Sequence, residues 1–226
     1  MIGTIVNTVA IIGGGFLGSF LKGKFSSKIQ ETVMQGISLA VMLIGLKMAF
    51  SLDKSNGTIL IIFSLVIGGI IGEVIDIEKR LNNVGDWLRK RVSDDEFFVQ
   101  GFVQTSLIYC VGAMAIMGAI QDGLNNNPSL LFTKSLLDGT SSIAFAATYG
   151  IGVVFSALPV FIYQGSITIL ASYAQQILSD SMIMGMTATG GLLIFAIGLN
   201  IIKVAEIKVG NLLPSLLVAI ILFGVF

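Results

Sequence analysis

One face of a predicted helix, between residues 134 and 156, carries the side chains best suited to bind a polar solute or an ion. Asp138, Ser142 and Tyr149 share this face, because they are separated by whole turns of a helix. Lys134 lies one turn before Asp138, within pairing distance. A carboxylate inside a membrane helix can titrate where it is removed from water, so Asp138 is our candidate for a coupling or gating group.

A second polar face follows on the next predicted helix, where side chains recur at a strict interval of four residues: Gln164, Thr168, Ser172 and Gln176. Two polar faces on neighbouring helices can line a water-filled path together. They can equally hold the helices together through hydrogen bonds, each of which contributes about 0.6 kcal/mol on average in a membrane. Both interpretations remain open at this point.

Both faces belong to a stretch without charge. No Asp, Glu, Lys or Arg occurs between Gly139 and Ser179, a run of 41 residues. A helical crossing of a bilayer needs about 20 mostly apolar residues, so this run can hold two crossings in succession. Polar side chains inside a membrane usually face the protein interior or a water-filled cavity.

The composition predicts an integral membrane protein. Of the 226 residues, 54% are hydrophobic and 12% are charged, and the mean hydropathy is +0.93; soluble domains are about 25% charged. The 13 basic and 13 acidic residues balance, so we expect no nucleic acid partner. The chain has no His and a single Cys, and we find no HExxH, GxSxG or P-loop motif. We therefore expect no enzyme activity, no metal and no cofactor.

We predict an all-α, polytopic membrane protein that forms a single transmembrane domain, residues 1–226. A charged connector at about 77–96 has apolar residues at helical spacing, typical of an amphipathic helix on the cytoplasmic membrane surface. It anchors the chain to lipid or has a regulatory role. The eight expected transmembrane helices lie at about 2–21, 29–50, 58–75, 98–120, 131–155, 158–178, 182–202 and 209–226.

The basic residues predict the orientation, because Lys and Arg favour the cytoplasmic side. With the N-terminus outside and eight crossings, ten of the thirteen basic residues fall in cytoplasmic loops. With seven crossings, Lys203 and Lys208 would instead lie outside, against this preference of basic residues. We therefore expect both termini outside.

A weak internal repeat appears when the chain is shifted by 153 residues. Residues 44–47, Ile-Gly-Leu-Lys, then align with residues 197–200, Ile-Gly-Leu-Asn, and Gly57 aligns with Gly210. The matched helices are five crossings apart, so the copies have opposite orientation. We predict an inverted-topology repeat of residues 1–76 and 157–226, with residues 98–155 between the copies; such repeats are frequent in transporters.

Other polar residues are candidates for a substrate or ion pathway, although each can also be a contact between helices. Lys47 can reach the headgroups from near the outer end of its helix. Pro159 either starts a helix or breaks one. The full set of candidates is Asn7, Gln35, Lys47, Gln104, Gln121, Asp122, Asp138, Ser142, Tyr149, Tyr163, Gln164, Thr168 and Asn200.

Several short motifs occur along the chain: the Gly72-Glu73 exit of the third predicted helix, Tyr109-Cys110-Val111-Gly112, residues 118–124 with Gln121 and Asp122, residues 134–139 with Asp138, residues 144–147, and Leu158-Pro159 through Gln164-Gly165. Together they resemble the YqgA/YdfK-like bacterial inner-membrane proteins, a family without a known function. The resemblance covers essentially the whole chain. It implies a bacterial cytoplasmic-membrane protein and brings no substrate and no established site.

From the residues we expect a secondary transporter or facilitator of a small solute or ion. The alternative is a non-transporting membrane scaffold or sensor, whose polar faces interlock and leave no access for water. Small-xxx-small pairs such as Gly14–Gly18 and Gly68–Gly72 let helices approach closely. Because these faces exceed what one small bundle needs, a homodimer in the lipid bilayer is also expected.

Overall fold

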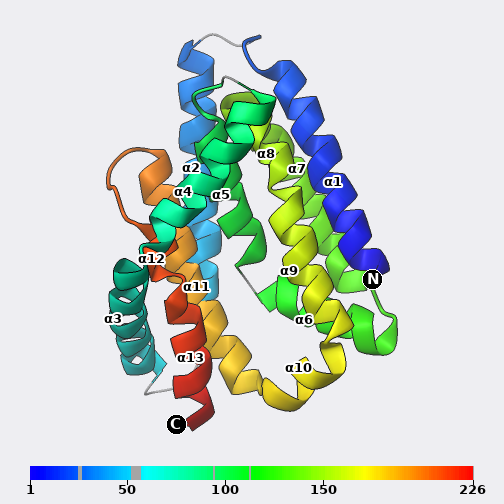
Figure 1. Cartoon of the computed structure of the whole chain (residues 1–226), viewed down its shortest axis with the longest axis vertical. Coiled ribbons are helices and arrows are strands. Elements are labelled where there is room, and N and C mark those ends of the chain that lie inside the picture. Colours follow the sequence, from blue (N-terminus) through cyan, green and yellow to red (C-terminus); the bar gives the residue numbers. More distant parts are fainter. Residues whose placement is uncertain (25–26, 52–56, 94, 112, 226) are drawn as a thin grey trace. The chain divides into compact units, whose positions relative to one another are not determined.

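Helices make up nearly all of the structure, a computed structural model that describes residues 1–226 except 25–26, 52–56, 94, 112 and 226 (Figure 1). The predicted segments 77–96, 98–120 and 209–226 each include a residue outside this description. No strand occurs among the described residues, so the all-α prediction is confirmed. The helices are α1 (Ile2–Leu21), α2 (Ser27–Ala49), α3 (Gly57–Ile75), α4 (Ile77–Val92), α5 (Phe98–Cys110), α6 (Ala113–Asn125), α7 (Ser129–Tyr149), α8 (Gly152–Phe155), α9 (Ala157–Ile169), α10 (Ala171–Ile177), α11 (Asp180–Ile201), α12 (Val209–Leu212) and α13 (Pro214–Val225).

Within the described chain, five helices are long and apolar enough to cross a membrane: residues Ile2–Leu21, Glu31–Ala49, Gly57–Ile75, Gly152–Ile169 and Asp180–Ile201. A sixth span results if α5 and α6, which are bent by 60° relative to each other, are taken as one. The two remaining predicted crossings correspond to α7, which carries Lys134 and Asp138, and to the shorter apolar segment Val209–Val225. The structure thus supports a polytopic membrane protein, and the count of eight stays a prediction.

The boundary between the fifth and sixth predicted crossings is wrong by several residues. α7 ends at Tyr149, and Gly150 turns the chain with a φ of 78°, a left-handed conformation that glycine adopts without strain. Residues 152–155, expected at the end of the fifth crossing, instead begin the span that continues through α9. Pro159 is the third residue of α9 and lies inside this span, three residues after the break at Ser156 that separates α8 from α9. Pro159 therefore stands near the start of α9, but the crossing itself begins at Gly152.

Two compact units arise from the contacts within the chain. Unit 1 comprises Met1–Met34, Asn82–Cys110 and Met114–Gln175, and unit 2 comprises Gln35–Leu81, Val111–Ala113 and Gln176–Phe226. The single transmembrane domain stays a prediction.

In unit 1, α1 packs along the whole of α7. Gly3 lies against Leu131, Gly14 against the backbone of Gly139, and Gly18 against the backbone of Ile143. The contacts advance together along both helices, so α1 and α7 run in the same direction. α9 packs on α1 in the opposite direction, and α5 packs on α7, α8 and α9.

In unit 2, α13 packs on α3 and α11. Glycines again form the contacts: the Cα positions of Gly68 and Gly72 lie against the backbones of Ser215 and Asn211. A small apolar cluster of Ile61, Ala188, Ala219 and Phe223 fills the space between the three helices. The buried face of this unit is therefore built from small and apolar groups.

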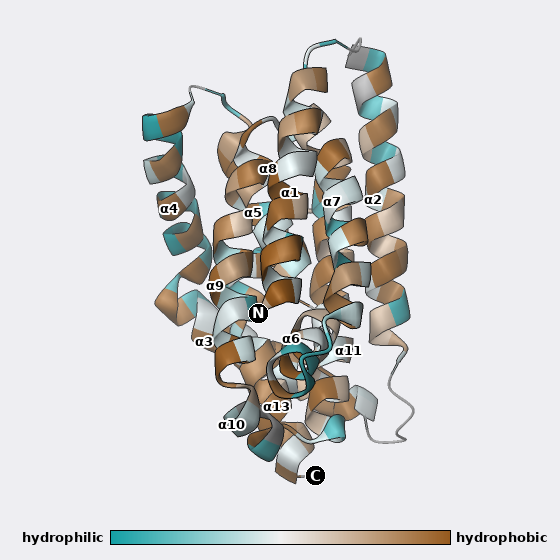
Figure 2. Ribbon diagram, turned by 90° about the vertical axis from the view of Figure 1, so that its right-hand side faces the viewer, coloured by the Kyte–Doolittle hydropathy of each residue, from teal (hydrophilic) through white to brown (hydrophobic). Residues whose placement is uncertain are grey.

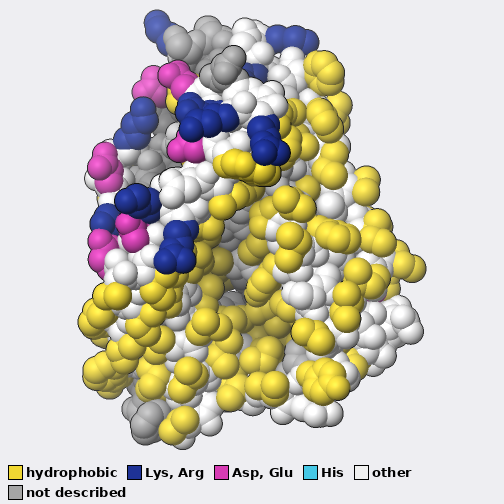
Figure 3. All heavy atoms as spheres, in the orientation of Figure 1, with side chains coloured by type: hydrophobic (Ala, Val, Ile, Leu, Met, Phe, Trp, Pro, Cys, Tyr) yellow, Lys and Arg dark blue, Asp and Glu magenta, His cyan; other side chains and the backbone are white. Residues whose placement is uncertain are grey.

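α4 is the charged helix expected between residues 77 and 96. Gly85 is buried against Val99, whereas Val84 and Trp87 are about half exposed. The Arg91 guanidinium lies over the Trp87 ring, 4.1 Å from its centroid. Figure 2 shows hydrophilic residues interleaved with hydrophobic ones along this helix, and Lys and Arg side chains gather over it on the face seen in Figure 3. The helix is confirmed, and its location on the membrane surface stays a prediction.

Candidate functional site

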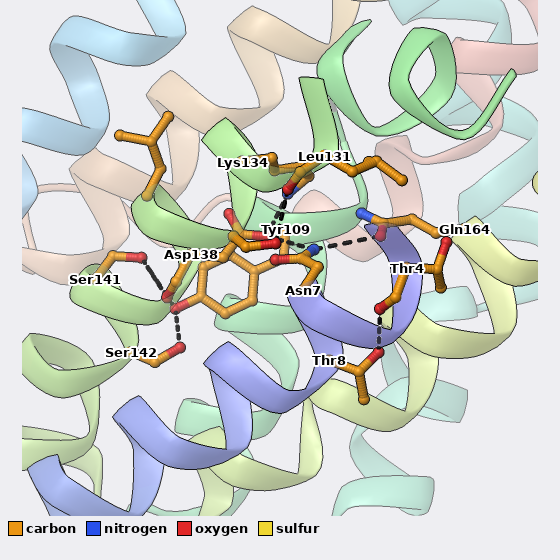
Figure 4. A network of polar contacts seen from close by, with 12 residues as sticks. Thr4, Asn7, Thr8, Tyr109, Leu131, Lys134, Asp138, Ser141, Ser142 and Gln164 are labelled. Carbon is orange, nitrogen blue, oxygen red and sulfur yellow. Dashed lines mark hydrogen bonds and ion pairs between the residues drawn. The ribbon is translucent and has the colours of Figure 1, made fainter. Parts of the chain in front are cut away.

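A network of buried polar side chains lies in unit 1 where α1, α5, α7 and α9 meet (Figure 4). Asn7 comes from α1, Tyr109 from α5, Asp138 from α7 and Gln164 from α9. In the close-up, Asn7 lies between Asp138 and Gln164. Four helices that are distant in sequence therefore supply one cluster.

An ion pair between Lys134 and Asp138 forms the charged part of this network. The two side chains are only 8% and 9% exposed. Asn7 Nδ2 donates to Asp138 Oδ2 at 3.0 Å, and the Lys134 ammonium lies 5.8 Å from the centroid of the Tyr109 ring. Removing two charges from water costs several kcal/mol for each ion, roughly what their mutual attraction returns, so this pair is weak evidence for stability.

The two amides beside the ion pair are only partly satisfied. Asn7 Nδ2 also donates to Gln164 Oε1, at 3.3 Å. Asn7 Oδ1 and Gln164 Nε2 have no partner, although both side chains are fully buried. Leaving a buried polar group unpaired costs about 1–3 kcal/mol. The site thus holds one unused acceptor and one unused donor next to a carboxylate and an ammonium.

Hydroxyl groups continue the network on both sides. Tyr109 and Ser142 are joined through their hydroxyls at 2.9 Å, and Ser141 donates to the Tyr109 oxygen at 3.2 Å. The hydroxyls of Thr4 and Thr168 are 3.3 Å apart across α1 and α9. These bonds tie α5 to α7 and α1 to α9, whereas the two predicted polar faces on α7 and α9 are joined through Asn7 of α1.

Glycine explains why Asn7 can reach Asp138. A Cβ atom at Gly14 would overlap the carbonyl oxygen of Gly139, and Ala10 also packs against Gly139. Small residues let two helix backbones approach closely. The short side chain of Asn7, two turns before Gly14, therefore spans the gap to α7.

The predicted site residues have different outcomes. Five of them, Asn7, Asp138, Ser142, Gln164 and Thr168, come together in the network. In unit 1, Gln104 Oε1 and the Tyr149 hydroxyl are buried without partners, Tyr163 and Gln121 are half-buried, and Asp122 accepts from the Gly3 N–H at 3.0 Å.

The three candidates in unit 2 lie elsewhere. Gln35 and Lys47 are exposed. Asn200 exchanges two hydrogen bonds with the backbone of Ile207, which closes the turn after α11. Asn200 therefore has a structural contact, the alternative already considered for it.

Four of the network members described above were not among the candidates: Thr4, Tyr109, Lys134 and Ser141. Lys134 was considered only as the neighbour of Asp138. Tyr109 stands at the start of a motif of the resemblance, and Thr4 shares a helix face with Asn7 at helical spacing, which is the signal that indicates it. Nothing in the local sequence indicates that the Tyr109 hydroxyl meets Ser142, because the two residues belong to different helices.

A second polar cluster lies at one end of unit 2. Glu73 accepts from Lys208 and Asn211, and Glu78 accepts from the Gly210 N–H, which joins α3 and α4 to the start of α12. The hydrogen bond and the negative charge of Glu73 raise the pKa of Lys208. Among the described residues, no group of three or more His, Cys, Asp or Glu side chains could hold a metal ion.

Comparison with known proteins agrees with the resemblance seen in the sequence. The family model described as "Protein of unknown function (DUF554)" matches residues 2–224. The chain is 35% identical over 219 residues to the uncharacterized membrane protein YdfK of Bacillus subtilis, covering 96% of this chain and 93% of the relative. It is 30% identical over 226 residues to the uncharacterized protein YqgA of Escherichia coli, covering 97% and 94%. No solved structure matches the chain.

Proposed function

The chain belongs to the DUF554 family of membrane proteins of unknown function, and from this premise we propose that it is a secondary transporter or facilitator of a small solute or ion across the bacterial cytoplasmic membrane. The observation that carries the proposal is the buried Lys134–Asp138 pair with its unpartnered amides. Ionisable side chains within membrane helices are costly, and they typically mark ion or substrate pathways.

The contacts between α2 and α11 support the inverted repeat in this proposal. Gly45 packs against Gly191 and Phe195, and its counterpart Gly198 packs against Ser38 and Met42. Gly191 and Phe195 lie 153 positions after Ser38 and Met42, respectively. The same offset of 153 residues relates the two copies of the sequence repeat. Two copies that exchange equivalent contacts are expected from an inverted pair around a twofold axis.

The directions of the helices in unit 1 support the proposed topology. α1 and α7 run in the same direction, as the first and fifth of eight crossings must. Lys22 just after α1 pairs with Asp95 just before α5, which supports the proposal because the basic residues predict that both lie on the cytoplasmic side. We therefore propose an inner-membrane protein with both termini outside.

Flux into proteoliposomes tests the function. We expect the wild-type chain to move at least one small solute or ion, and Asp138→Asn to reduce that flux at least about tenfold, because removing a charge from a paired site costs more than 1.4 kcal/mol. Ser141→Ala, at the edge of the network, is the matched control with a small effect. Flux unchanged by Asp138→Asn would remove Asp138 from the mechanism.

A scaffold or sensor is the second candidate, because Ser142 and Thr168 are closed off by hydrogen bonds within the bundle. Cysteines placed at Ser142, Tyr149 and Thr168 separate the two. Labelling by a water-soluble reagent from either face supports transport, whereas protection of all three positions supports the scaffold.

We also propose that the chain forms a homodimer in the bilayer, where membrane lipids surround it. The glycine faces that suggested a dimer are occupied within the chain: α7 covers Gly14 and Gly18, α13 covers Gly68, and α12 covers Gly72. A dimer would therefore use another face. Crosslinking in native membranes that yields only monomer would remove it.

A further inference from the structure

The charge of the buried network restricts what it can bind. Lys134 and Asp138 neutralise each other, and another buried carboxylate of unit 1, Asp122 on α6, is already held by the Gly3 N–H and the Met1 nitrogen. A lone cation that binds Asp138 would leave the Lys134 ammonium buried and unpaired. A lone anion that binds Lys134 would leave the Asp138 carboxylate in the same state. Both outcomes are strongly unfavourable in a site of low dielectric constant.

A ligand that carries both charges avoids this difficulty. Its ammonium can take the place of Lys134 on the carboxylate, and its carboxylate can take the place of Asp138 on the lysine. No net charge is then buried, and each charged group keeps a partner. Because Lys134 and Asp138 are on successive turns of α7, the two charges of the ligand must be close together.

The unpartnered amide atoms match such a ligand. Asn7 Oδ1 is an unused acceptor next to Asp138, where the ligand ammonium needs acceptors. Gln164 Nε2 is an unused donor that can bond to a carboxylate. Both side chains are fully buried, so water outside the bundle does not satisfy these atoms. The site therefore offers an ion pair and, through Asn7 and the Gln164 side chain bonded to it, one unused acceptor and one unused donor.

We propose that the Lys134, Asp138, Asn7 and Gln164 side chains form a binding site for a small zwitterion, an amino acid-like solute whose ammonium and carboxylate are separated by one or two carbon atoms. This inference rests on the proposed transport function and names its substrate class. In the structure described, the Lys134–Asp138 pair closes the site. Binding exchanges this internal pair for two pairs with the ligand.

Thermal unfolding of the full chain in detergent tests the inference with matched probes. Glycine, L-alanine and β-alanine are the zwitterions, N-acetylglycine is the anion, glycinamide is the cation and acetamide is the neutral amide, all at equal ionic strength. We expect at least one zwitterion to raise Tm increasingly with concentration, because a ligand that binds the folded state stabilises it by mass action. The three other probes should leave Tm unchanged at the same concentrations.

The paired variant Lys134→Met/Asp138→Leu is the control. It also lacks net charge at the site, so it is expected to fold, and it should lose the shift caused by the zwitterions. A shift that persists in this variant shows general stabilisation by the solute and overturns the inference. For Asp138→Asn alone, equilibrium dialysis with radiolabelled zwitterion should show affinity weakened at least about tenfold.

The remaining outcomes separate this inference from the proposed function. If the monovalent cation or anion stabilises the chain as well as the zwitterions do, or if no zwitterion changes Tm, the zwitterion site is overturned. If cysteines at Ser142 and Thr168 are nevertheless labelled from water, or if flux of another solute is measured, the proposed transport function is retained and only the zwitterion site is rejected. When these positions are also protected from both faces, the two proposals fail together.

Discussion

The interiors of the two units are built differently. In unit 1, the helices that meet at the centre bury an ammonium, a carboxylate and two amides, and some of these atoms have no partner. In unit 2, the contacts of α3 with α13 and of α2 with α11 are made by glycine backbones and apolar side chains. Its ion pair, Glu73 with Lys208, has side chains that are 58% and 61% exposed.

This difference separates two uses of buried surface in a membrane. Glycine contacts bring helices together through van der Waals packing and bury no charge; in unit 2 the Thr189 hydroxyl is buried without a partner, but no ion pair or side-chain amide pair accompanies it in the described structure. A buried network with unpaired atoms contributes little to stability, because its members lose hydration that their bonds only partly replace. The helix contacts of unit 2 thus serve packing, whereas the buried network of unit 1 has the properties of a binding site.

The largest effect on stability should come from breaking the ion pair on one side only. Asp138→Leu leaves the Lys134 ammonium buried without a partner and should destabilise the chain by about 3–5 kcal/mol. The double variant Lys134→Met/Asp138→Leu should recover most of this loss. Thermal unfolding in detergent measures both. Equal destabilisation by the single and double variants would contradict the interpretation of unit 1 as a site maintained for function.

The next largest effect is expected from the glycine contacts between the helices of unit 2. A Cβ atom at Gly72 would overlap the backbone of Asn211, so Gly72→Ala should separate α3 from α12 and destabilise the chain by about 1–3 kcal/mol. Gly36→Ala is the control, because a Cβ atom at Gly36 meets no neighbouring atom. It should be neutral or slightly stabilising, since alanine is the better helix former. Similar losses of Tm in both variants would show that close packing is not the cause.

A smaller effect should follow when the site loses its unsatisfied amide. Gln164→Leu removes the unpartnered Nε2, and Asn7 keeps its bond to Asp138. We expect the free energy of unfolding to change by less than about 1 kcal/mol, because the lost hydrogen bond and the relieved unpaired donor nearly compensate. Ser38→Ala, which removes a bond to the Gly198 carbonyl in unit 2, has no such compensation. If Gln164→Leu lowers the free energy of unfolding clearly more than Ser38→Ala does, the network of unit 1 contributes more to stability than the packing of unit 2, contrary to this interpretation.

The smallest effect should come from the exposed pair of unit 2. Glu73→Gln removes an ion pair that water and salt already screen, so it should lower Tm only slightly. The difference from wild type should shrink as NaCl is raised, because salt weakens interactions between exposed charges. Tm measured at low and high salt checks this. A salt-independent difference would point to the Glu73 bond with Asn211 as the main contribution.

The helix boundaries illustrate where sequence reasoning stopped. Apolar length located α1, α2, α3 and α11 within a few residues. It missed the end of α7 at Tyr149, because Gly150 lies in an apolar stretch that could equally continue a helix. The surroundings there leave room for glycine but not for a larger residue, because a Cβ atom at Gly150 would meet the side chains of Asp95 and Lys22, which pair beside it.

The sequence by itself determined the membrane class and the family, and it predicted the Lys134–Asp138 pair, because residues four apart on a helix are neighbours in any fold. Only the tertiary structure decided that Asn7 and Gln164 join them. Asn7 is 131 residues from Asp138 and 157 from Gln164, and the bonds between them form only where glycine lets α1 approach α7 and where α9 packs back on α1. Such approaches depend on which surfaces fit each other across the whole bundle, and no local pattern of residue types encodes that fit.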